Sequence, residues 1–171
     1  SIYEGISNDA GRTWTNREIY SSPDGTTCEC CKPTVTMRNN VVYVMFRNWI
    51  NGNRDMHIMK SEDGGMSFSD PQQVGTGNWK LNGCPMDGGD LQINSDQQAV
   101  TIWRREGKLF AATGPGNEQF LAEGKNGSLQ LTTTGNAYAW IDKGNIIRRI
   151  IINTFRNDFR YKVQGIAQIS I

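Results

Sequence analysis

A chain of 171 residues is long enough for one domain with its own hydrophobic core, and a composition of 37% hydrophobic and 20% charged residues excludes a disordered protein. The net charge of +1, with no block of like charge, gives no indication of a nucleic-acid-binding surface. The apolar stretches are too short to cross a bilayer, so no membrane contact is expected either.

Strand signals dominate the chain from beginning to end. Residues 41–46, 99–103 and 136–140 are rich in β-branched or aromatic side chains and are bounded by turn residues. Turn signals are frequent, with 19 glycines and several Asn-Gly pairs, and no stretch has the periodicity of a helix. The sequence therefore predicts an all-β fold.

One pattern, a strand followed by a polar turn and a second strand, recurs in three segments. The segments are 33–47, 90–104 and 128–142, and residues 72–74 and 119–124 supply fourth strands to the first two units. Antiparallel four-stranded units that recur in this way are typical of β-propeller blades. About three blades are predicted within a single domain: a half blade over 1–27, blades over 28–80 and 81–125, and a partial blade with C-terminal strands over 126–171.

Two stretches, SNDAGRTW and SEDGGMSF, share the pattern Ser-x-Asp-x-Gly-x-Ser/Thr-aromatic. Each is expected to form a self-contained turn. The aspartate accepts backbone N–H groups, the glycine adopts a positive φ, and the aromatic residue starts the outer strand and packs into the blade. A carboxylate held in this way stays ionised and is a poor proton donor. This structural role is assigned to Ser7, Asp9, Gly11, Trp14, Ser61, Asp63, Gly65 and Phe68.

These turns resemble the Asp-boxes, or BNR repeats, of the sialidase superfamily, and residues 30–68 resemble one sialidase-like blade. The resemblance extends over residues 1–142. It implies a β-propeller whose ligand site lies at the axial end opposite the boxes. Many non-catalytic propellers carry such boxes, so the boxes indicate the fold more than an activity.

The catalytic parts that this resemblance implies are incomplete. Family members clamp a carboxylate with arginines and use a Tyr–Glu pair with an acid/base aspartate. Here Cys31-Lys32-Pro33 stands in place of an Arg-Ile-Pro stretch, and the loop 48–53 contains no acid. The Tyr–Glu pair cannot be placed, so the catalytic residues stay unassigned and a non-catalytic module is expected.

The predicted axial face still carries polar side chains from the turns between strands. Arginine forks and carboxylates suit sugar hydroxyls or an anionic sugar, and Trp49 and Trp79, expected in loops, could stack on a sugar or pack under neighbouring loops. The alternative is that Arg47–Asp55 and Arg104–Asp90 ion pairs only hold the loops. His57 is interpreted as structural, and Trp14, Trp103 and Trp140 as core. The ligand-binding candidates are Arg47, Asn48, Arg54, Asp55, Asp87, Asp90, Arg104 and Arg105.

The four cysteines predict a cross-link between two segments. An even number of cysteines fits an oxidising compartment, so a disulfide from Cys28, Cys30 or Cys31 to Cys84 is favoured, with a secreted or periplasmic location. A thiolate metal site is the alternative, although paired Cys-x2-Cys knuckles are absent. The preferred interpretation includes no metal and no cofactor.

The function predicted is a sialidase-like β-propeller module that binds carbohydrate or a protein partner on its axial face. One alternative is a glycoside hydrolase completed by missing blades or by a second subunit, and another is a structural or assembly protein. About three blades do not close a ring, so we expect either a homodimer or a longer parent chain. The isoleucine-rich tail 145–171 is expected to add two strands.

Overall fold

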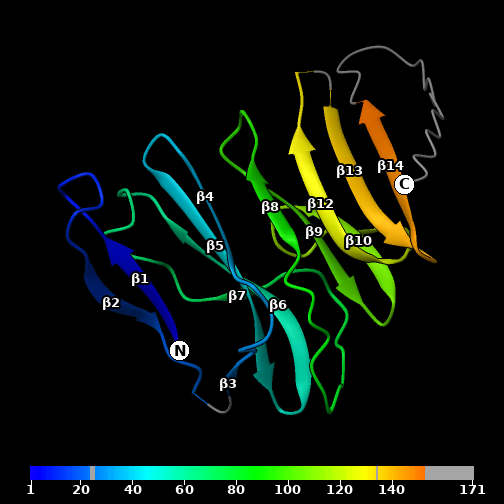
Figure 1. Cartoon of the computed structure of the whole chain (residues 1–171), viewed down its shortest axis with the longest axis horizontal. Coiled ribbons are helices and arrows are strands. Elements are labelled where there is room, and N and C mark those ends of the chain that lie inside the picture. The colour runs from blue at the N-terminus through cyan, green and yellow to red at the C-terminus, as the bar shows by residue number, and fades with distance from the viewer. Residues whose placement is uncertain (24–25, 134, 153–171) are drawn as a thin grey trace.

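The computed structural model describes residues 1–23, 26–133 and 135–152, and its regular structure is entirely antiparallel β-sheet (Figure 1). Within those ranges there is no helix, and hence no helix long and apolar enough to span a membrane. The predicted all-β class is confirmed. The reason lies in the chain itself, because its β-branched and aromatic runs are short and are separated by turn residues before a helix could form.

The N-terminal half contains two sheets. The first is a two-stranded ribbon, and in the second the long strand β5 pairs with both short strands β3 and β4 on one side and with β6 on the other. The ribbon consists of β1 (Ile2–Ile6) and β2 (Thr15–Tyr20). The second sheet consists of β3 (Thr26–Thr27), β4 (Thr34–Arg38), β5 (Val41–Ile50), β6 (Asn53–Ser61) and β7 (Gln72–Gln73).

The C-terminal half contains two further sheets, each with its strands in chain order. The four-stranded sheet consists of β8 (Asp90–Ile93), β9 (Ala99–Arg105), β10 (Lys108–Thr113) and β11 (Glu118–Glu123). The three-stranded sheet consists of β12 (Lys125–Leu131), β13 (Gly135–Asp142) and β14 (Asn145–Ile152). Strand β14 is the first of the two strands expected from the tail, and the second, after residue 152, lies outside the described residues.

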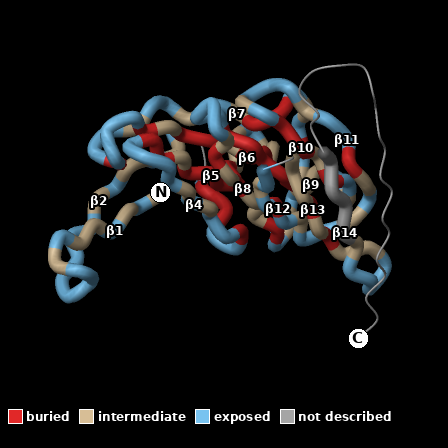
Figure 2. The backbone as a smooth tube through the Cα atoms, turned by 90° about the horizontal axis from the view of Figure 1, so that it is seen from above, coloured by how far each residue is buried: buried red, intermediate tan, exposed pale blue. Residues whose placement is uncertain are grey.

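Successive sheets stand side by side. Strand β8 lies between β4 and β12, so one strand from each of three consecutive sheets lies beside the next (Figure 1). Apolar side chains fill the spaces between the sheets, and the buried stretches of the chain run through the middle of the molecule (Figure 2). Each inner sheet is therefore covered on both faces, which explains why β5 is buried along most of its length instead of alternating. Ring closure, by a second copy or by more chain, stays a prediction.

Three clusters of side chains form this core. Met45, Met56 and Trp103 belong to the cluster between the β5–β6 and β8–β9 regions. Ile102, Leu109 and Trp140 belong to the cluster between the last two sheets, and Val44, Phe46 and Met59 meet the N-terminal ribbon. Trp103 and Trp140 are buried as predicted.

The hairpin between β5 and β6 is tighter than the sequence suggested. Asn51 and Gly52 form a two-residue turn with φ of 52° and 82°, which is the Asn-Gly hairpin that lets two strands continue almost to the tip. Arg47 and Asn48 consequently lie within β5, opposite Met56 and Asp55 of β6. The expectation that these residues belong to a loop was wrong, because the predicted strand over 41–46 runs on to residue 50.

Candidate functional site

The two aspartate turns have the same hydrogen bonds. Asp9 accepts the backbone N–H and hydroxyl of Thr13, at 2.8 and 2.7 Å, and the hydroxyl of Ser7 at 2.9 Å. Asp63 accepts the corresponding groups of Ser67 and Ser61 at 2.6–2.9 Å. These donors hold the pKa of Asp9 at about 2 and lower the pKa of Asp63 as well. Both carboxylates are therefore occupied by their own turns.

The aromatic residues that end the two turns behave differently. Phe68 packs against the core cluster that contains Val44, Phe46 and Met59. Trp14 is 63% exposed and its indole N–H donates to the carbonyl of Gly11, in its own turn. The prediction that Trp14 packs into the core was wrong, because the ribbon β1–β2 has no further sheet on its outer side among the described residues.

Arg47 connects three segments of the chain by hydrogen bonds. Its side chain is 1% exposed, and its guanidinium donates to the backbone carbonyls of Arg54 at 2.6 Å, Asp87 at 3.0 Å and Arg104 at 3.0 Å. Burial lowers the pKa of Arg47, and the nearby thiol of Cys31 is the neighbour that raises it most. The hydrogen bonds of the Arg47 guanidinium therefore stabilise the fold and are not available to a ligand.

Three other candidates also hold the fold. Asn48 is fully buried and donates to the hydroxyl of Tyr20 at 2.7 Å. The carboxylate of Asp87 accepts the backbone N–H of Asn126 at 2.9 Å, and that of Asp90 accepts the N–H of Leu129 at 2.8 Å. Asp87, just before β8, and Asp90, the first residue of β8, therefore both connect to β12, which lies in the next sheet.

The loop tryptophans are covered by arginines. Trp79 is 8% exposed, with the guanidinium groups of Arg47 and Arg104 at 5.4 and 5.9 Å from its ring centre. Trp49 belongs to β5, and Arg54 stacks on it at 4.5 Å. Neither ring forms an open platform for a sugar, so of the two interpretations the packing one holds.

The expected ion pairs do not form. Within the described residues no salt bridge joins Arg47 to Asp55 or Arg104 to Asp90. Arg105 instead makes a bidentate pair with Glu118, with both distances 2.7 Å, and this pairing lowers the pKa of Glu118 to about 2. Glu118 lies 13 residues away and was not a candidate.

One of the candidates, Asp55, faces a polar cleft of about 290 Å³, which we call the Asp55 cleft. Its carboxylate accepts the backbone N–H of Trp79 at 2.7 Å, and burial raises its pKa. Gln73 donates to Asn78 across the cleft at 3.1 Å. The cleft is lined by Ile50, Asn51, Asn53, Asp55, His57, Gln73 and Asn78.

His57 also lines this cleft, and its interpretation as a structural residue stays a prediction. Its Nδ1 lies 3.2 Å from the backbone carbonyl of Asp55, and burial lowers the pKa of the imidazole, so the ring is neutral at pH 7. The sequence contained a signal for the cleft: Asn53, Asp55 and His57 alternate along one strand and therefore share one face of it. Gln73 and Asn78 carried no such signal, because a separate segment brings them there.

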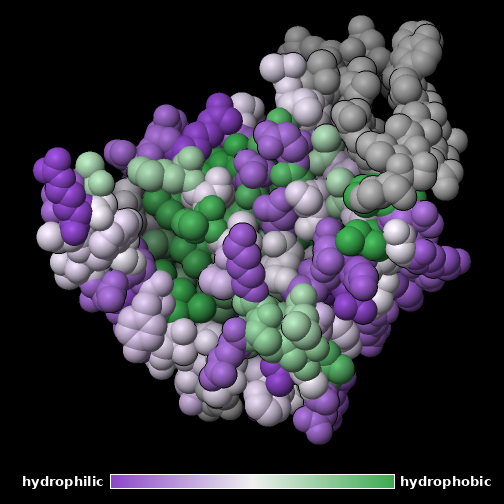
Figure 3. Space-filling model, in the orientation of Figure 1, coloured by the Kyte–Doolittle hydropathy of each residue, from purple (hydrophilic) through white to green (hydrophobic). Residues whose placement is uncertain are grey.

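A second cleft, of about 350 Å³, lies between the β3–β7 and β8–β11 sheets and has a more apolar lining that includes Tyr43, Ile58 and Pro115. Apolar side chains also gather over β4 and β5 on the face seen in Figure 3. Val35 and Met37 of β4 are exposed. The titratable groups that line the second cleft are Tyr43 and Lys60, with no carboxyl group or imidazole among its described lining residues.

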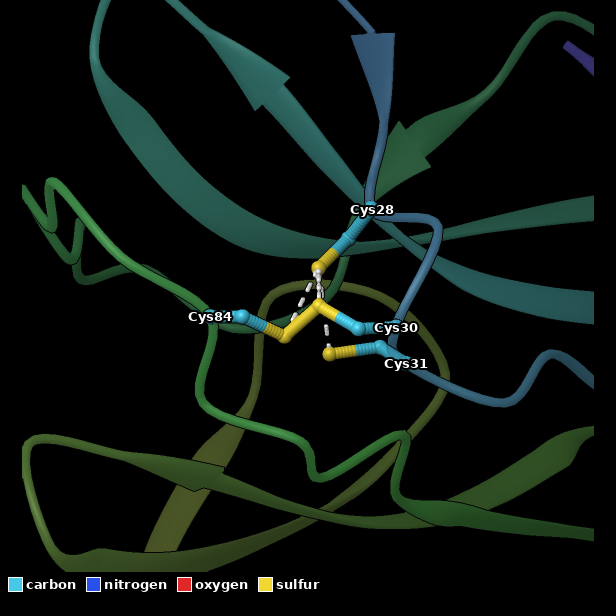
Figure 4. Close-up of side chains that lie close together, drawn as sticks. All are labelled: Cys28, Cys30, Cys31 and Cys84. Atoms are coloured by element: carbon cyan, nitrogen blue, oxygen red, sulfur yellow. Dashed lines mark hydrogen bonds between the residues drawn. A yellow bond between two sulfur atoms is a disulfide. The ribbon is translucent and has the colours of Figure 1, made fainter.

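The cysteines lie together, as the predicted cross-link requires. Cys30 and Cys84 form a disulfide, and Cys28 and Cys31 are buried free thiols beside it (Figure 4). Burial raises the pKa of Cys31. Within the described residues these four side chains are the one group of ligating residues that could hold a metal ion.

Comparison with solved structures finds a distant likeness. The structure is similar to that of a mutant of the GH43 protein BlXynB from Bacillus licheniformis, with 11% sequence identity and a TM-score of 0.43. The alignment covers 72% of this chain and 29% of that protein, so the chain spans less than a third of its length. No protein-family model and no curated protein matches the sequence. A likeness at this level carries no information on activity.

Proposed function

We propose that the chain is a non-catalytic, carbohydrate-binding module of the sialidase-like β-propeller class, and that it binds a neutral sugar in the Asp55 cleft. The observation that carries the proposal is the lining of this cleft. It combines four carboxamides, a neutral imidazole and a single carboxyl group. These groups both donate and accept hydrogen bonds, as the hydroxyls of a sugar require.

The same lining argues against hydrolysis. Cleavage of a glycosidic bond by the usual route needs two carboxyl groups on opposite sides of the bond. Asp55 is the one carboxyl group among the residues that line the cleft, and it already accepts a hydrogen bond from the backbone of Trp79. The described residues at the cleft also include no arginine, so the proposal favours a neutral sugar over an acidic one.

The test is a glycan-array screen of the full chain, followed by calorimetric titration of the neutral mono- and oligosaccharides that bind. Asp55→Asn keeps an oxygen for the N–H of Trp79 but removes the charge. It is expected to weaken binding about tenfold or more, because a hydrogen bond to a charged group contributes roughly 1.5–3 kcal/mol. Asn78→Ala tests the opposite wall of the cleft, and Asp96→Asn, in an exposed turn between β8 and β9, is the matched control.

The outcomes separate the candidate functions. Binding of neutral glycans that is weakened by Asp55→Asn and Asn78→Ala but not by Asp96→Asn supports the proposal. If neither Asp55→Asn nor Asn78→Ala weakens glycan binding, the ligand binds elsewhere and the proposal is overturned. The absence of any glycan ligand would also overturn the proposal. Release of a shorter glycan during incubation would identify a glycoside hydrolase instead.

A further inference from the structure

Four cysteine sulfurs from two distant segments meet at one point (Figure 4). Cys28, Cys30 and Cys31 lie between β3 and β4, whereas Cys84 lies between β7 and β8. The four sulfur atoms all lie within 4.8 Å of one another. A disulfide requires only two sulfurs, so it does not account for the position of the two buried thiols.

Cys30 and Cys84 are joined as a disulfide and must separate on reduction, but the distances from Cys28 to the other three sulfurs are close to those of a tetrahedral metal site. Cys28 Sγ lies 3.2 Å from Cys31 Sγ, 3.6 Å from Cys30 Sγ and 3.9 Å from Cys84 Sγ. With Zn–S bonds of about 2.3 Å, four thiolates around Zn²⁺ lie roughly 3.8 Å apart. Four sulfur ligands in this geometry are typical of zinc or iron.

Two arginines place positive charge beside the sulfurs. Arg54 Nη1 donates to Cys28 Sγ at 3.4 Å. Arg47 is 1% exposed and donates to backbone carbonyls, and no described salt bridge includes it. The carboxylate of Asp87 favours the charge of this buried guanidinium, and so do the sulfurs of Cys31 and Cys28. Four thiolates around one Zn²⁺ carry a net double negative charge, which these two guanidinium groups balance.

The backbone around the cysteines is also arranged for anionic sulfur. The N–H of Met86 points to Cys84 Sγ at 3.4 Å, and such outer hydrogen bonds orient and stabilise metal-bound thiolates. The two segments approach so closely that a Cβ at Gly88 would overlap the carbonyl oxygen of Lys32. Tertiary packing therefore preforms the site, instead of leaving the metal to gather the ligands.

We propose that the reduced chain binds one Zn²⁺ through Cys28, Cys30, Cys31 and Cys84, as a structural ion that joins the segment before β4 to the segment before β8. A small dithiol first reduces the Cys30–Cys84 disulfide and becomes a disulfide itself. Zn²⁺ then replaces the protons of the four thiols, which are released to solvent. In the oxidised chain the Cys30–Cys84 disulfide makes the same connection without a metal. The inference is independent of the proposed sugar site.

The experiment begins with the full chain reduced by dithiothreitol under argon and freed of metal with a chelator. The chain is loaded with Zn²⁺, passed through a desalting column and analysed for zinc and for free thiols. We expect one zinc per chain and four thiols that react only after a chelator is added. Loading with Co²⁺ instead is expected to give the intense visible bands and the sulfur-to-metal charge-transfer band of a four-thiolate tetrahedral site.

Two variants separate zinc binding from the disulfide. Cys28→Ser leaves the disulfide intact but is expected to lose the zinc retained on the column. Arg54→Gln keeps all four ligands and is expected to lower zinc affinity about tenfold. Circular dichroism checks that each variant is folded.

The measurement on the unmodified chain decides even where a variant fails to fold. A reduced, folded chain that retains no zinc and gives no cobalt bands would overturn the proposal. Zinc retained equally by folded Cys28→Ser would overturn it too, and so would an iron–sulfur chromophore in the protein as purified.

Discussion

Two regions of the molecule satisfy the hydrogen bonds of charged side chains in different ways: the two aspartate turns at 7–14 and 61–68, and the surroundings of Arg47. They differ in how far apart in the sequence the hydrogen-bonding partners lie. Each turn aspartate receives its hydrogen bonds from within four residues. Arg47 has partners 7, 40 and 57 residues away. The hydrogen bonds of each aspartate turn can form within the turn alone, whereas those of Arg47 form only when three segments have packed together.

The difference shows which polar residues are structural and which remain for a ligand. A repeated, carboxylate-rich motif attracts attention, yet Asp9 and Asp63 have all their hydrogen bonds within their own turns. Arg47, expected on a ligand-binding face, is equally occupied. Asp55 differs from Arg47, because its carboxylate receives one backbone N–H and otherwise faces a cleft.

The largest effect is expected from Arg47→Met. The variant leaves three backbone carbonyls in the interior without their donor, and we expect it to lower the free energy of unfolding by about 3 kcal/mol. Urea unfolding followed by tryptophan fluorescence measures this. Arg12→Met, in the exposed turn that contains Asp9, is the matched control and should change stability by less than about 0.5 kcal/mol. If the two variants lowered the free energy of unfolding equally, the hydrogen bonds of Arg47 would contribute no more to stability than an exposed turn residue does.

A smaller difference is expected between the two turn aromatics. Phe68→Ala removes a half-buried ring from a core cluster and should cost about 1.5 kcal/mol. Trp14→Ala removes an exposed ring and should cost less than about 0.5 kcal/mol. Thermal unfolding of both variants checks this. Comparable losses would mean that a further surface covers Trp14 in solution.

The turn carboxylates should also affect stability in acid. The folded pKa of Asp9 is about 2, below the unfolded value of about 4. A lowered pKa contributes stability at all pH values above the unfolded pKa, and this contribution is lost as the pH falls through the folded pKa. The difference in melting temperature between the unmodified chain and Asp9→Asn should therefore be constant above pH 4 and vanish towards pH 2. If the difference in melting temperature persisted unchanged at pH 2, the ionised carboxylate of Asp9 would not be what stabilises the turn.

The smallest effect, and of opposite sign, is expected from Asp55→Asn. Burial raises the pKa of this carboxyl, so its contribution is most favourable below the unfolded pKa and is lost as the pH rises through the folded pKa. The variant should melt slightly higher than the unmodified chain at pH 7 and should lose that advantage at pH 4. A lower melting temperature at pH 7 would show that the charge of Asp55 stabilises the fold instead of serving a ligand.

Much of the fold could be predicted from the sequence, because strands and turns depend on neighbouring residues. The runs at 41–46, 99–103 and 136–140 are strands, and each turn aspartate accepts a backbone N–H as expected. The two hydroxyls that also donate to each carboxylate were not predicted. The candidate site was predicted poorly for the opposite reason. Arg47 does lie against the backbone of Asp87, yet nothing in the local sequence of Arg47, Asn48 or Asp87 showed that their hydrogen bonds go to the protein itself.

The sequence by itself determined the all-β class, the order of the strands and the self-contained turns around Asp9 and Asp63, since each depends on contacts within a few residues. Only the tertiary structure decided that Arg105 pairs with Glu118, that Gln73 and Asn78 join Asp55 and His57 around a cleft, and which of the three clustered cysteines is bonded to Cys84. The first two contacts involve different strands of one sheet, together with the loop after β7, and the third joins the segment before β4 to the segment before β8 of a different sheet. Each needs segments distant in the chain to become neighbours, and no local pattern records that.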